Sequence, residues 1–295
     1  MICACIDIGS NTIRLLVAEP VDGRLRELLR QRAFTRIGKN LKQDDRVSSK
    51  KIAQVAEVVA TQVRVARELG AEVIRAVATA AIREASNQQE IIDAIHAAAG
   101  VEVELLDDEE EARLAFVGAT RALERAPEGD VVVVDVGGSS SEIALGTVAE
   151  GVRWSTSFRL GSGRLADAYL RSDPPSVHEL EDVRRHVAGA FEGLALSTPE
   201  LAIAVGGTAT SLRRLVGAML DHETLERGLR ILATTSIDEV AGQFELEPER
   251  VRLLPAGMLI LEQVSDLLAT PLLIGKGGIR EGVIFEMLAG SGTLG

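Results

Sequence analysis

Residues 131–146 read VVVVDVGGSSSEIALG: four valines run into an aspartate, and a turn of small residues leads into a second apolar segment. Residues 3–19 read CACIDIGSNTIRLLVAE and repeat the same order of features. Continuous apolar runs are typical of strands buried on both faces. Glycine, serine and asparagine between two such runs are typical of a turn. The chain therefore contains the pattern strand, aspartate, glycine turn and strand twice, which indicates two related halves.

The composition indicates two α/β domains with an aliphatic core. The chain has 295 residues, of which 46% are apolar and only 3% aromatic, and domains usually contain roughly 100–200 residues. The formal charge is −12, and a strongly acidic chain is a poor general partner for nucleic acid or an anionic membrane. We therefore expect no DNA partner and no membrane partner. A polyanionic substrate would need a local basic site.

The cysteines and the N-terminus argue against an exported protein or a zinc protein. Cys3 and Cys5 are two apart on a predicted strand and point to one face, so we expect reduced core thiols. Zinc would need further ligands close by, and the histidines are distant in sequence. The first strand begins at once, with no signal pattern, and no apolar run approaches the roughly 20 residues of a membrane helix. We expect a cytoplasmic protein.

Periodicity and breakers predict the same order of elements in both halves. In the first half we expect strands at 2–8, 11–19, 24–34, 72–77 and 101–106, and helices at 48–69, 79–84, 88–99 and 109–123. After a break at 126–129 we expect strands at 131–135, 141–145, 151–159, 201–205 and 272–274, and helices at 164–170, 176–194, after 208 and from 279. Mixed sheets covered by helices are the expected result.

The two repeated turns have the chemistry of phosphate sites. Glycine permits positive φ and lets a ligand approach the main chain, and successive N–H groups can form an anion-binding concavity. The first turn offers Gly9, Ser10 and Asn11. The second offers Gly137, Gly138, Ser139, Ser140 and Ser141. The aspartates that precede the turns, Asp7 and Asp135, suit a cation that accompanies phosphate. The alternative is that both are simply good hairpin turns.

A third glycine turn, Gly206-Gly207-Thr208, stands between a short predicted strand and a helix. Helix N-termini are anion sites because of the helix dipole and the free N–H groups. No Walker A loop, no nucleophile elbow and no convincing set of serine, histidine and aspartate occurs in the sequence.

These motifs resemble those of the actin/heat-shock protein/sugar-kinase superfamily. Within it, the chain closely resembles the exopolyphosphatase/guanosine pentaphosphate phosphatase (Ppx/GppA) family. The matching pieces are DIGSNTIRLLVAE (7–19), TRIGKNL (35–41), ATAAIREA (78–85), EEEARLAF (109–116), DVGGSSSEIALG (135–146), RLGSGRL (159–165), AVGGTATSL (204–212) and GIREGVIFE (278–286). They follow the family order over essentially the whole chain.

The resemblance implies a fold and a domain plan. It implies two actin-like, ribonuclease H-like domains, each with a mixed five-stranded sheet flanked by helices, and a cleft between them. We expect the first domain at 1–125 and the second at 126–278. The helix at about 279–295 is expected to pack back on the first domain.

The resemblance also implies roles for charged residues. In the family signature the glutamate directly before Ala112-Arg113 activates water, and that residue is Glu111, with Glu110 as the alternative. The neighbouring acids are explained by the dipole of the helix that starts there. Arg83 and Arg36 are expected to hold the anionic substrate, because guanidinium groups match phosphate oxygens.

Basic residues also gather in one stretch of the acidic chain, and one arginine lies far from it. Between 30 and 51 the basic residues are Arg30, Arg32, Arg36, Lys39, Lys42, Arg46, Lys50 and Lys51, against Asp44 and Asp45. A run of charged residues usually forms a solvent-exposed face, and we expect about half of these basic residues to belong to such a face. Arg280 matches a family motif and is either a site residue or a structural ion-pair residue.

The sequence departs from the family pattern at three places. Ser139 and Ser141 replace a glycine and a threonine of the second turn, and Ser139 would strain that turn if the position needs positive φ. No histidine precedes Gly228, where the family often has a His-Gly pair. The long members carry extra C-terminal helical domains that this sequence lacks, so we expect a preference for shorter substrates.

The function expected from the resemblance is removal of terminal orthophosphate from linear inorganic polyphosphate. Asp135 and Glu142, with Asp7, are expected to hold Mg²⁺, with Mn²⁺ as the alternative metal. The first rival is hydrolysis of guanosine pentaphosphate (pppGpp). Less favoured are a phosphotransferase that uses ATP or ADP and a non-catalytic phosphate- or nucleotide-sensing module. A homodimer is common for this architecture, and nothing in the sequence fixes it.

Overall fold

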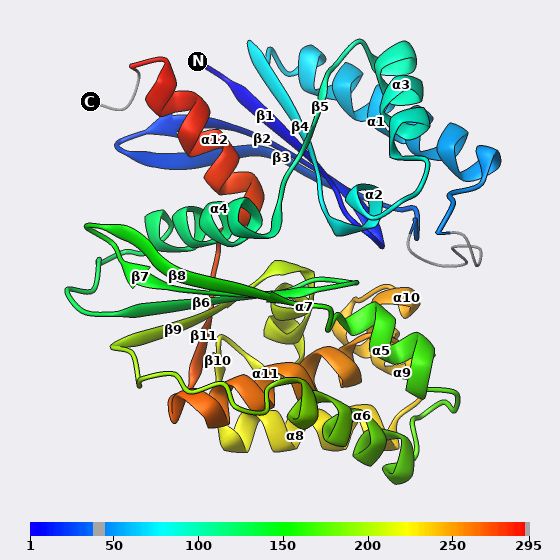
Figure 1. Cartoon of the computed structure of the whole chain (residues 1–295), viewed down its shortest axis with the longest axis vertical. Coiled ribbons are helices and arrows are strands. Elements are labelled where there is room, and N and C mark those ends of the chain that lie inside the picture. Colours follow the sequence, from blue (N-terminus) through cyan, green and yellow to red (C-terminus); the bar gives the residue numbers. More distant parts are fainter. Residues whose placement is uncertain (38–44, 293–295) are drawn as a thin grey trace. The chain divides into compact units, whose positions relative to one another are not determined.

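The computed structural model describes residues 1–37 and 45–292, and the contacts divide the chain into two compact units (Figure 1). Unit 1 comprises Met1–Ala122 and Gly277–Gly295, and unit 2 comprises Leu123–Lys276. Within the described part of the chain, none of the helices combines the length and the apolar character needed to cross a bilayer.

Unit 1 is built on a five-stranded mixed sheet. Its strands are β1 (Cys3–Ile8), β2 (Thr12–Val21), β3 (Arg24–Phe34), β4 (Val73–Ala78) and β5 (Val103–Leu105), in the order β3-β2-β1-β4-β5. β1 pairs antiparallel with β2 and parallel with β4, and β4 pairs parallel with β5. The helices of unit 1 are α1 (Ser49–Glu68), α2 (Ala80–Arg83), α3 (Gln88–Ala99), α4 (Asp108–Arg121) and α12 (Ile279–Gly290).

The central strand of unit 1 is buried on both faces, as its unbroken apolar sequence predicts. Ala4, Ile6 and Ile8 face the core that α1 and α3 cover. Cys3 and Cys5 face a second core with α4 and α12, and both thiols are free and buried. Burial raises the pKa of the Cys5 thiol. The expectation of reduced core thiols on one strand face agrees with this arrangement.

Helices α4 and α12 cross at closely packed glycines. A Cβ at Gly118 would lie 1.9 Å from the Gly278 carbonyl oxygen, and a Cβ at Gly282 would lie 2.1 Å from the Leu114 carbonyl oxygen. Neither position has room for a side chain. The crossing fixes α4, whose first turn carries Glu111, against α12.

Unit 2 has six strands, one more than the five expected. They are β6 (Val131–Val136), β7 (Ser141–Thr147), β8 (Gly151–Phe158), β9 (Leu201–Val205), β10 (Met219–Leu220) and β11 (Leu272–Ile274), in the order β10-β11-β9-β6-β7-β8. The additional strand is β10, which consists of two residues and pairs antiparallel with β11. A segment of that length has no periodicity that a sequence can reveal.

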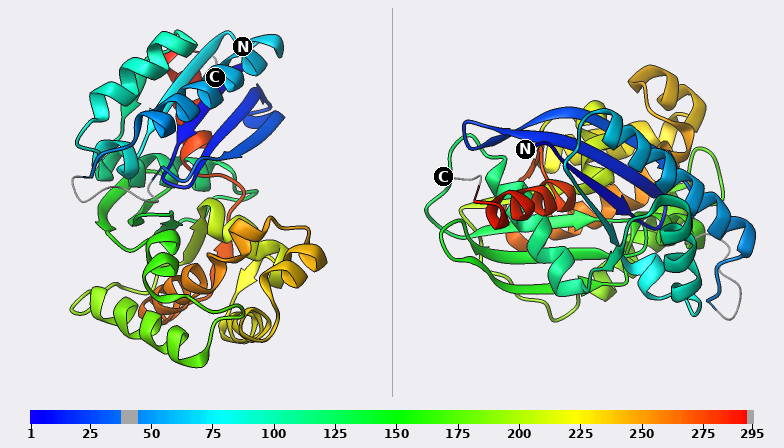
Figure 2. Two further views of the ribbon diagram at one scale, coloured as in Figure 1. Left: turned by 90° about the vertical axis from the view of Figure 1, so that its right-hand side faces the viewer. Right: turned by 90° about the horizontal axis from the view of Figure 1, so that it is seen from above.

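The helices of unit 2 share one large core with its sheet. They are α5 (Ser162–Tyr169), α6 (Val177–Ala190), α7 (Gly206–Val216), α8 (His222–Thr234), α9 (Ile237–Phe244), α10 (Pro248–Val251) and α11 (Leu254–Leu268). Val132, Val134 and Val136 of β6 point into this core, in which α11 is almost wholly buried. Figure 2 shows α6, α8 and α11 together on one side of the unit 2 sheet.

The two sheets repeat one topology, which confirms the duplication inferred from the two turns. Leaving out β10, the order β8-β7-β6-β9-β11 of unit 2 corresponds strand by strand to the order β3-β2-β1-β4-β5 of unit 1. Both sheets also have an irregularity at the same distance from the strand-end aspartate, between Val17 and Ala18 in β2 and between Leu145 and Gly146 in β7.

Candidate functional site

In unit 1 the predicted site residues gather at the carboxyl ends of the three parallel strands. Ile8 pairs with Ala78, and Ala78 pairs with Leu105, so β1, β4 and β5 end side by side. The segments that leave these ends are the turn after β1, helix α2 with Arg83, and helix α4 with Glu111. In sheets of this type, ligands bind outside the carboxyl ends of the strands.

The first glycine turn is a tight, main-chain-bonded hairpin. The Gly9 N–H donates to the Thr12 carbonyl at 3.1 Å. The Asn11 carbonyl accepts from the N–H groups of both Thr35 and Arg36, each at 3.0 Å. The end of β3 therefore holds the turn and brings Arg36 next to it.

Glu111 is a buried carboxylate on the first turn of α4. It is 3% exposed, and its N–H donates to the Asp107 carbonyl at 2.9 Å. Asp107 is the N-cap of α4 and accepts from the Glu110 N–H at 2.8 Å. Helix capping therefore explains Asp107, and the burial of Glu111 sets it apart from its acidic neighbours.

Glu110, the alternative base, is engaged elsewhere. Its carboxylate accepts from Arg113 at 2.7 and 2.8 Å, and this pairing lowers the pKa of Glu110. Arg113 is also paired with Glu286 of α12. Glu110 therefore belongs to a structural ion-pair network that joins α4 to α12.

Arg83 is the partner of Glu111. Its Nη1 donates to Glu111 Oε1 at 2.5 Å and to the Leu106 carbonyl, and its Nη2 pairs with Asp108. Partial burial works to lower the pKa of Arg83, but the hydrogen bond and the charge of Glu111 outweigh it and the pKa is raised. Asp108 was expected only to balance the dipole of α4, and its pairing with Arg83 adds it to this group.

Asp7 lies opposite a cation on the neighbouring strand. Asp7 is 9% exposed and pairs in register with Arg14 of β2. Burial raises the pKa of Asp7, while the charges of Arg14 and Arg280 act in the opposite direction. The hairpin register could have revealed Arg14, because an antiparallel pair places it directly across from Asp7. Arg280 lies close enough to act electrostatically on this site.

The basic residues between 30 and 51 make different kinds of contact. Arg30 pairs with Glu281 of α12 at 2.7 Å, Arg46 pairs with Glu90 at 2.6 Å, and Arg32 lies over the Phe34 ring. These three are structural or surface contacts. Lys39, Lys42 and Asp44 lie outside the described residues.

In unit 2 the second glycine turn is held by the start of a helix. The Gly137 N–H donates to the Ser140 carbonyl at 3.0 Å. The Ser162 N–H donates to the Gly137 carbonyl at 2.9 Å, and the Arg164 N–H donates to the Gly138 carbonyl at 2.9 Å. A Cβ at Gly161 would lie 2.4 Å from Gly138, so α5 begins directly against the turn. No role for Ser162 was predicted, although it lies in the family motif at 159–165.

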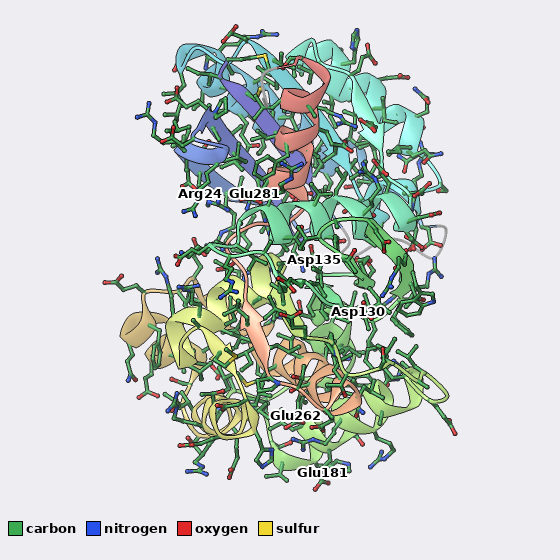
Figure 3. All side chains as sticks on the ribbon, turned by 90° about the vertical axis from the view of Figure 1, so that its left-hand side faces the viewer. Arg24, Asp130, Asp135, Glu181, Glu262 and Glu281 are labelled. Carbon is green, nitrogen blue, oxygen red and sulfur yellow. The ribbon has the colours of Figure 1, made fainter. Side chains whose placement is uncertain are left out.

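Two carboxylates stand across from each other beside this turn. Asp135 of β6 pairs in register with Glu142 of β7, and they are 8% and 3% exposed. Glu142 accepts from the Ser157 hydroxyl at 3.0 Å. Figure 3 marks Asp135 on the sheet of unit 2.

Over residues 1–37 and 45–292, no three or more acidic, histidine or cysteine side chains form a metal-binding group. Two carboxylates nevertheless match Mg²⁺, which usually takes one or two and completes its shell with water and phosphate.

The third glycine turn packs on the same aspartate. β9 runs parallel to β6 with Val205 opposite Asp135, and α7 starts at the next residue. Gly206 has a φ of +86°, and a Cβ there would lie 2.1 Å from Asp135 Oδ1. Only glycine fits this position.

Two predicted phosphate-binding side chains are buried. The Ser141 hydroxyl donates to the Leu160 carbonyl, and Ser141 is fully buried. Thr208 is 1% exposed, and its hydroxyl lies 3.4 Å from that of Ser162. Both side chains tie the start of α5 to its neighbours. Ser139 and Gly138 are half-buried, and Ser140 is 8% exposed.

Glycine was expected in the turns for two reasons, a positive φ and the close approach of a ligand to the main chain. Among the turn glycines, only Gly206 of the third turn has a positive φ. Gly9, Gly137 and Gly138 do not have positive φ, and neither does Ser139. Space is tight at Gly9 and Gly137, because a Cβ would lie 3.3 Å from the Thr12 carbonyl oxygen and 3.1 Å from the Ser140 carbonyl oxygen, respectively. The strain considered for Ser139 is therefore absent.

Comparison with known proteins gives a consistent result. The sequence model of the Ppx/GppA phosphatase family matches residues 16–290. Exopolyphosphatase 2 of Mycobacterium tuberculosis is 30% identical, with 89% of each chain covered. A guanosine-5'-triphosphate,3'-diphosphate pyrophosphatase of Aeromonas hydrophila is 26% identical over 97% of this chain and 59% of its own length. The crystal structure of the Aquifex aeolicus Ppx/GppA family member superposes with a TM-score of 0.84 at 27% identity, covering 99% of this chain and 98% of that one.

Proposed function

The chain belongs to the Ppx/GppA phosphatase family, and from that premise we propose that it is an exopolyphosphatase, which releases terminal orthophosphate from linear inorganic polyphosphate. The observation that carries the proposal is the contact of the half-buried Arg83 with the buried Glu111, at 2.5 Å, beside the first glycine turn. Hydrolysis of a phosphoanhydride needs a carboxylate that orients water for in-line attack and a cation that balances the charge on the phosphoryl oxygens. The contact between Glu111 and Arg83 places such a carboxylate and such a cation side by side.

Glu111 is the group that we propose takes the proton from the attacking water. Its backbone is fixed in the first turn of α4, and α4 is fixed on α12 by the glycine crossing. The Arg83 guanidinium donates to Glu111 Oε1 and holds the carboxylate in one orientation. A fixed carboxylate satisfies the positional requirement of general base catalysis.

Arg83 and the turns supply the binding of the phosphate. We propose that main-chain N–H groups of each turn bind phosphate oxygens of the substrate, at Ser10–Asn11 in unit 1 and at Gly138–Ser140 in unit 2, because the N–H groups of Gly9 and Gly137 bond within their turns. Main-chain donors in such turns are preorganised, so they stabilise developing charge without reorganising. Gly206 and Gly207, at the start of α7, offer further N–H groups at a helix N-terminus.

We propose Asp135 and Glu142 as the residues that would hold Mg²⁺. Bound there, Mg²⁺ would neutralise charge on the phosphate oxygens. Asp7 is the weaker candidate, because Arg14 lies opposite it and opposes a bound cation.

The second candidate function is hydrolysis of pppGpp by the same residues. The Aeromonas hydrophila relative, whose name states an activity on the guanosine compound, matches 97% of this chain and favours this candidate. The test is phosphate release by the purified protein from polyphosphates of defined length and from pppGpp, with and without Mg²⁺. We expect Mg²⁺-dependent release with the higher kcat/KM on polyphosphate. A higher kcat/KM on pppGpp would select the second candidate, and no release from either substrate would refute both.

A further inference from the structure

A group of cations lies at the start of α1, and its lysines have no part in the function described so far. The first turn of α1 contains Lys50 and Lys51 and no acidic residue, and its N-cap is Ser48. A helix N-terminus carries partial positive charge, so lysines there add to that charge instead of balancing it. Helix α4, with four acidic residues in its first turn, has the opposite and ordinary arrangement.

Lys51 is linked to the first glycine turn through one residue. Its Nζ donates to the Thr35 carbonyl and, at 2.7 Å, to Gln54 Oε1. The Thr35 N–H donates in turn to the Asn11 carbonyl at 3.0 Å. An ammonium group has three N–H donors, so Lys51 retains one more for a ligand oxygen while two acceptors fix its position.

Arg36 belongs to the same group. Its N–H also donates to the Asn11 carbonyl, and its backbone has a φ of +50°, which is uncommon for any residue other than glycine or asparagine. Such a conformation persists when the surroundings impose it. Here the hydrogen bond to Asn11 helps to impose it, so Arg36 is held beside the turn and next to Thr35.

The surroundings of Lys51 favour an anion. Burial and then the charges of Arg36 and Lys50 lower the pKa of Lys51, and among the described residues no carboxylate forms an ion pair with it. The Thr35 hydroxyl, also buried at this point, has no hydrogen-bond partner within the described residues. A bound anion would remove the repulsion between the cations.

We propose that Lys51 and Arg36 form a subsite for an internal phosphate group of the polyphosphate chain, adjoining the turn that binds its terminal phosphoryl group. The inference rests on the proposed function and names the part of the substrate that this surface binds. Internal phosphate groups of the inorganic chain offer only acceptor oxygens and negative charge. A guanidinium group and an ammonium group are the donors that match them.

The test compares Lys51→Gln with Lys50→Gln, which removes the same charge from the neighbouring exposed position of the same helix turn. We expect Lys51→Gln to raise the KM for polyphosphate about tenfold with kcat nearly unchanged, as loss of one charged hydrogen bond would do. Lys50→Gln should change KM by less than about twofold, and Lys51→Arg should restore it. Equal effects of the two glutamine variants, or a fall in kcat at constant KM, would overturn the subsite.

Equilibrium binding separates this proposal from the proposed function. Titration calorimetry with inorganic tripolyphosphate, in the absence of Mg²⁺, measures the subsite without turnover. We expect weaker binding by Lys51→Gln than by the wild type, with unchanged thermal unfolding. If the wild type releases no phosphate, the function fails, while equal tripolyphosphate affinities of the two proteins would overturn the subsite whether or not turnover is seen.

Discussion

The two units share one sheet topology and one hairpin turn, but they differ in the residue that faces the strand-end aspartate. In unit 1, Arg14 stands opposite Asp7. In unit 2, Glu142 stands opposite Asp135. A carboxylate facing a cation largely cancels its charge, whereas two facing carboxylates attract a divalent cation. The two halves of a duplicated scaffold thus differ at the same position, with an arginine facing the aspartate in one and a second carboxylate in the other.

The turns are also anchored differently. The end of β3 holds the turn of unit 1, through N–H groups that donate to Asn11. The start of α5 holds the turn of unit 2, through N–H groups that donate to Gly137 and Gly138. Each anchor brings a basic residue to its turn, Arg36 at the strand end and Arg164 at the start of α5.

The largest effect is expected at Glu111, the proposed base in unit 1. Glu111→Gln should lower kcat about 10²–10⁴-fold, because glutamine keeps the shape but cannot accept the proton of the attacking water. Glu110→Gln is the matched control on the same helix turn and should retain most of the activity, since Glu110 is paired with Arg113. The measurements are steady-state kinetics with polyphosphate and circular dichroism to check folding. Full activity in Glu111→Gln would remove the residue from its role.

The difference between the two aspartates can be tested by metal dependence. Glu142→Gln should raise the Mg²⁺ concentration for half-maximal activity by about tenfold or more, while it keeps an acceptor for the Ser157 hydroxyl. Asp7→Asn should raise it less, because Arg14 already opposes the charge of Asp7. Titration of activity with Mg²⁺ gives both values. A larger effect at Asp7 would reverse the assignment of the cation to unit 2.

The contact between the third turn and Asp135 predicts a loss of stability. Gly206→Ala places a Cβ at positive φ against the Asp135 carboxylate, and we expect it to lower the free energy of unfolding by about 1–3 kcal/mol. Gly189→Ala is the control, because Gly189 lies in α6 with nothing within 4 Å of its Cβ position. Alanine there should leave stability unchanged or slightly higher. Equal unfolding transitions for the two variants, measured by urea denaturation, would contradict this account.

The smallest effect is expected at Ser139, where the second turn departs from the family pattern. Ser139→Gly should change kcat/KM by no more than about twofold, since Ser139 does not have the positive φ that would make glycine necessary. The assay is the same steady-state measurement with polyphosphate. A large gain in activity on restoring the glycine would show that the serine does impair the turn.

Strands and long helices could be predicted because their signal is local. The unbroken apolar runs of β1 and β6, and the caps of α1 and α3, lie in consecutive residues. The two-residue β10 has no such signal, since it exists only by pairing with β11. The reason for the glycines was only partly predictable, because the folded turn positions the carbonyl oxygens that would crowd a Cβ at Gly9 and Gly137.

In the candidate site, too, local motifs could be predicted, and contacts between distant residues could not. The identity of Glu111 as a site residue came from a motif, but its pairing with Arg83 joins residues far apart in the chain and needed the fold. The contact between Lys51 and Thr35 likewise depends on how α1 packs beside the end of β3. The sequence shows which residues are charged, and the structure shows which charged residues are in contact.

The most direct test of the central claim is hydrolysis of polyphosphate in water enriched in oxygen-18. If Glu111 directs water at the terminal phosphorus, the label appears in the released orthophosphate and the chain shortens one phosphate at a time. Label retained on the shortened chain, or unlabelled orthophosphate, would contradict the account.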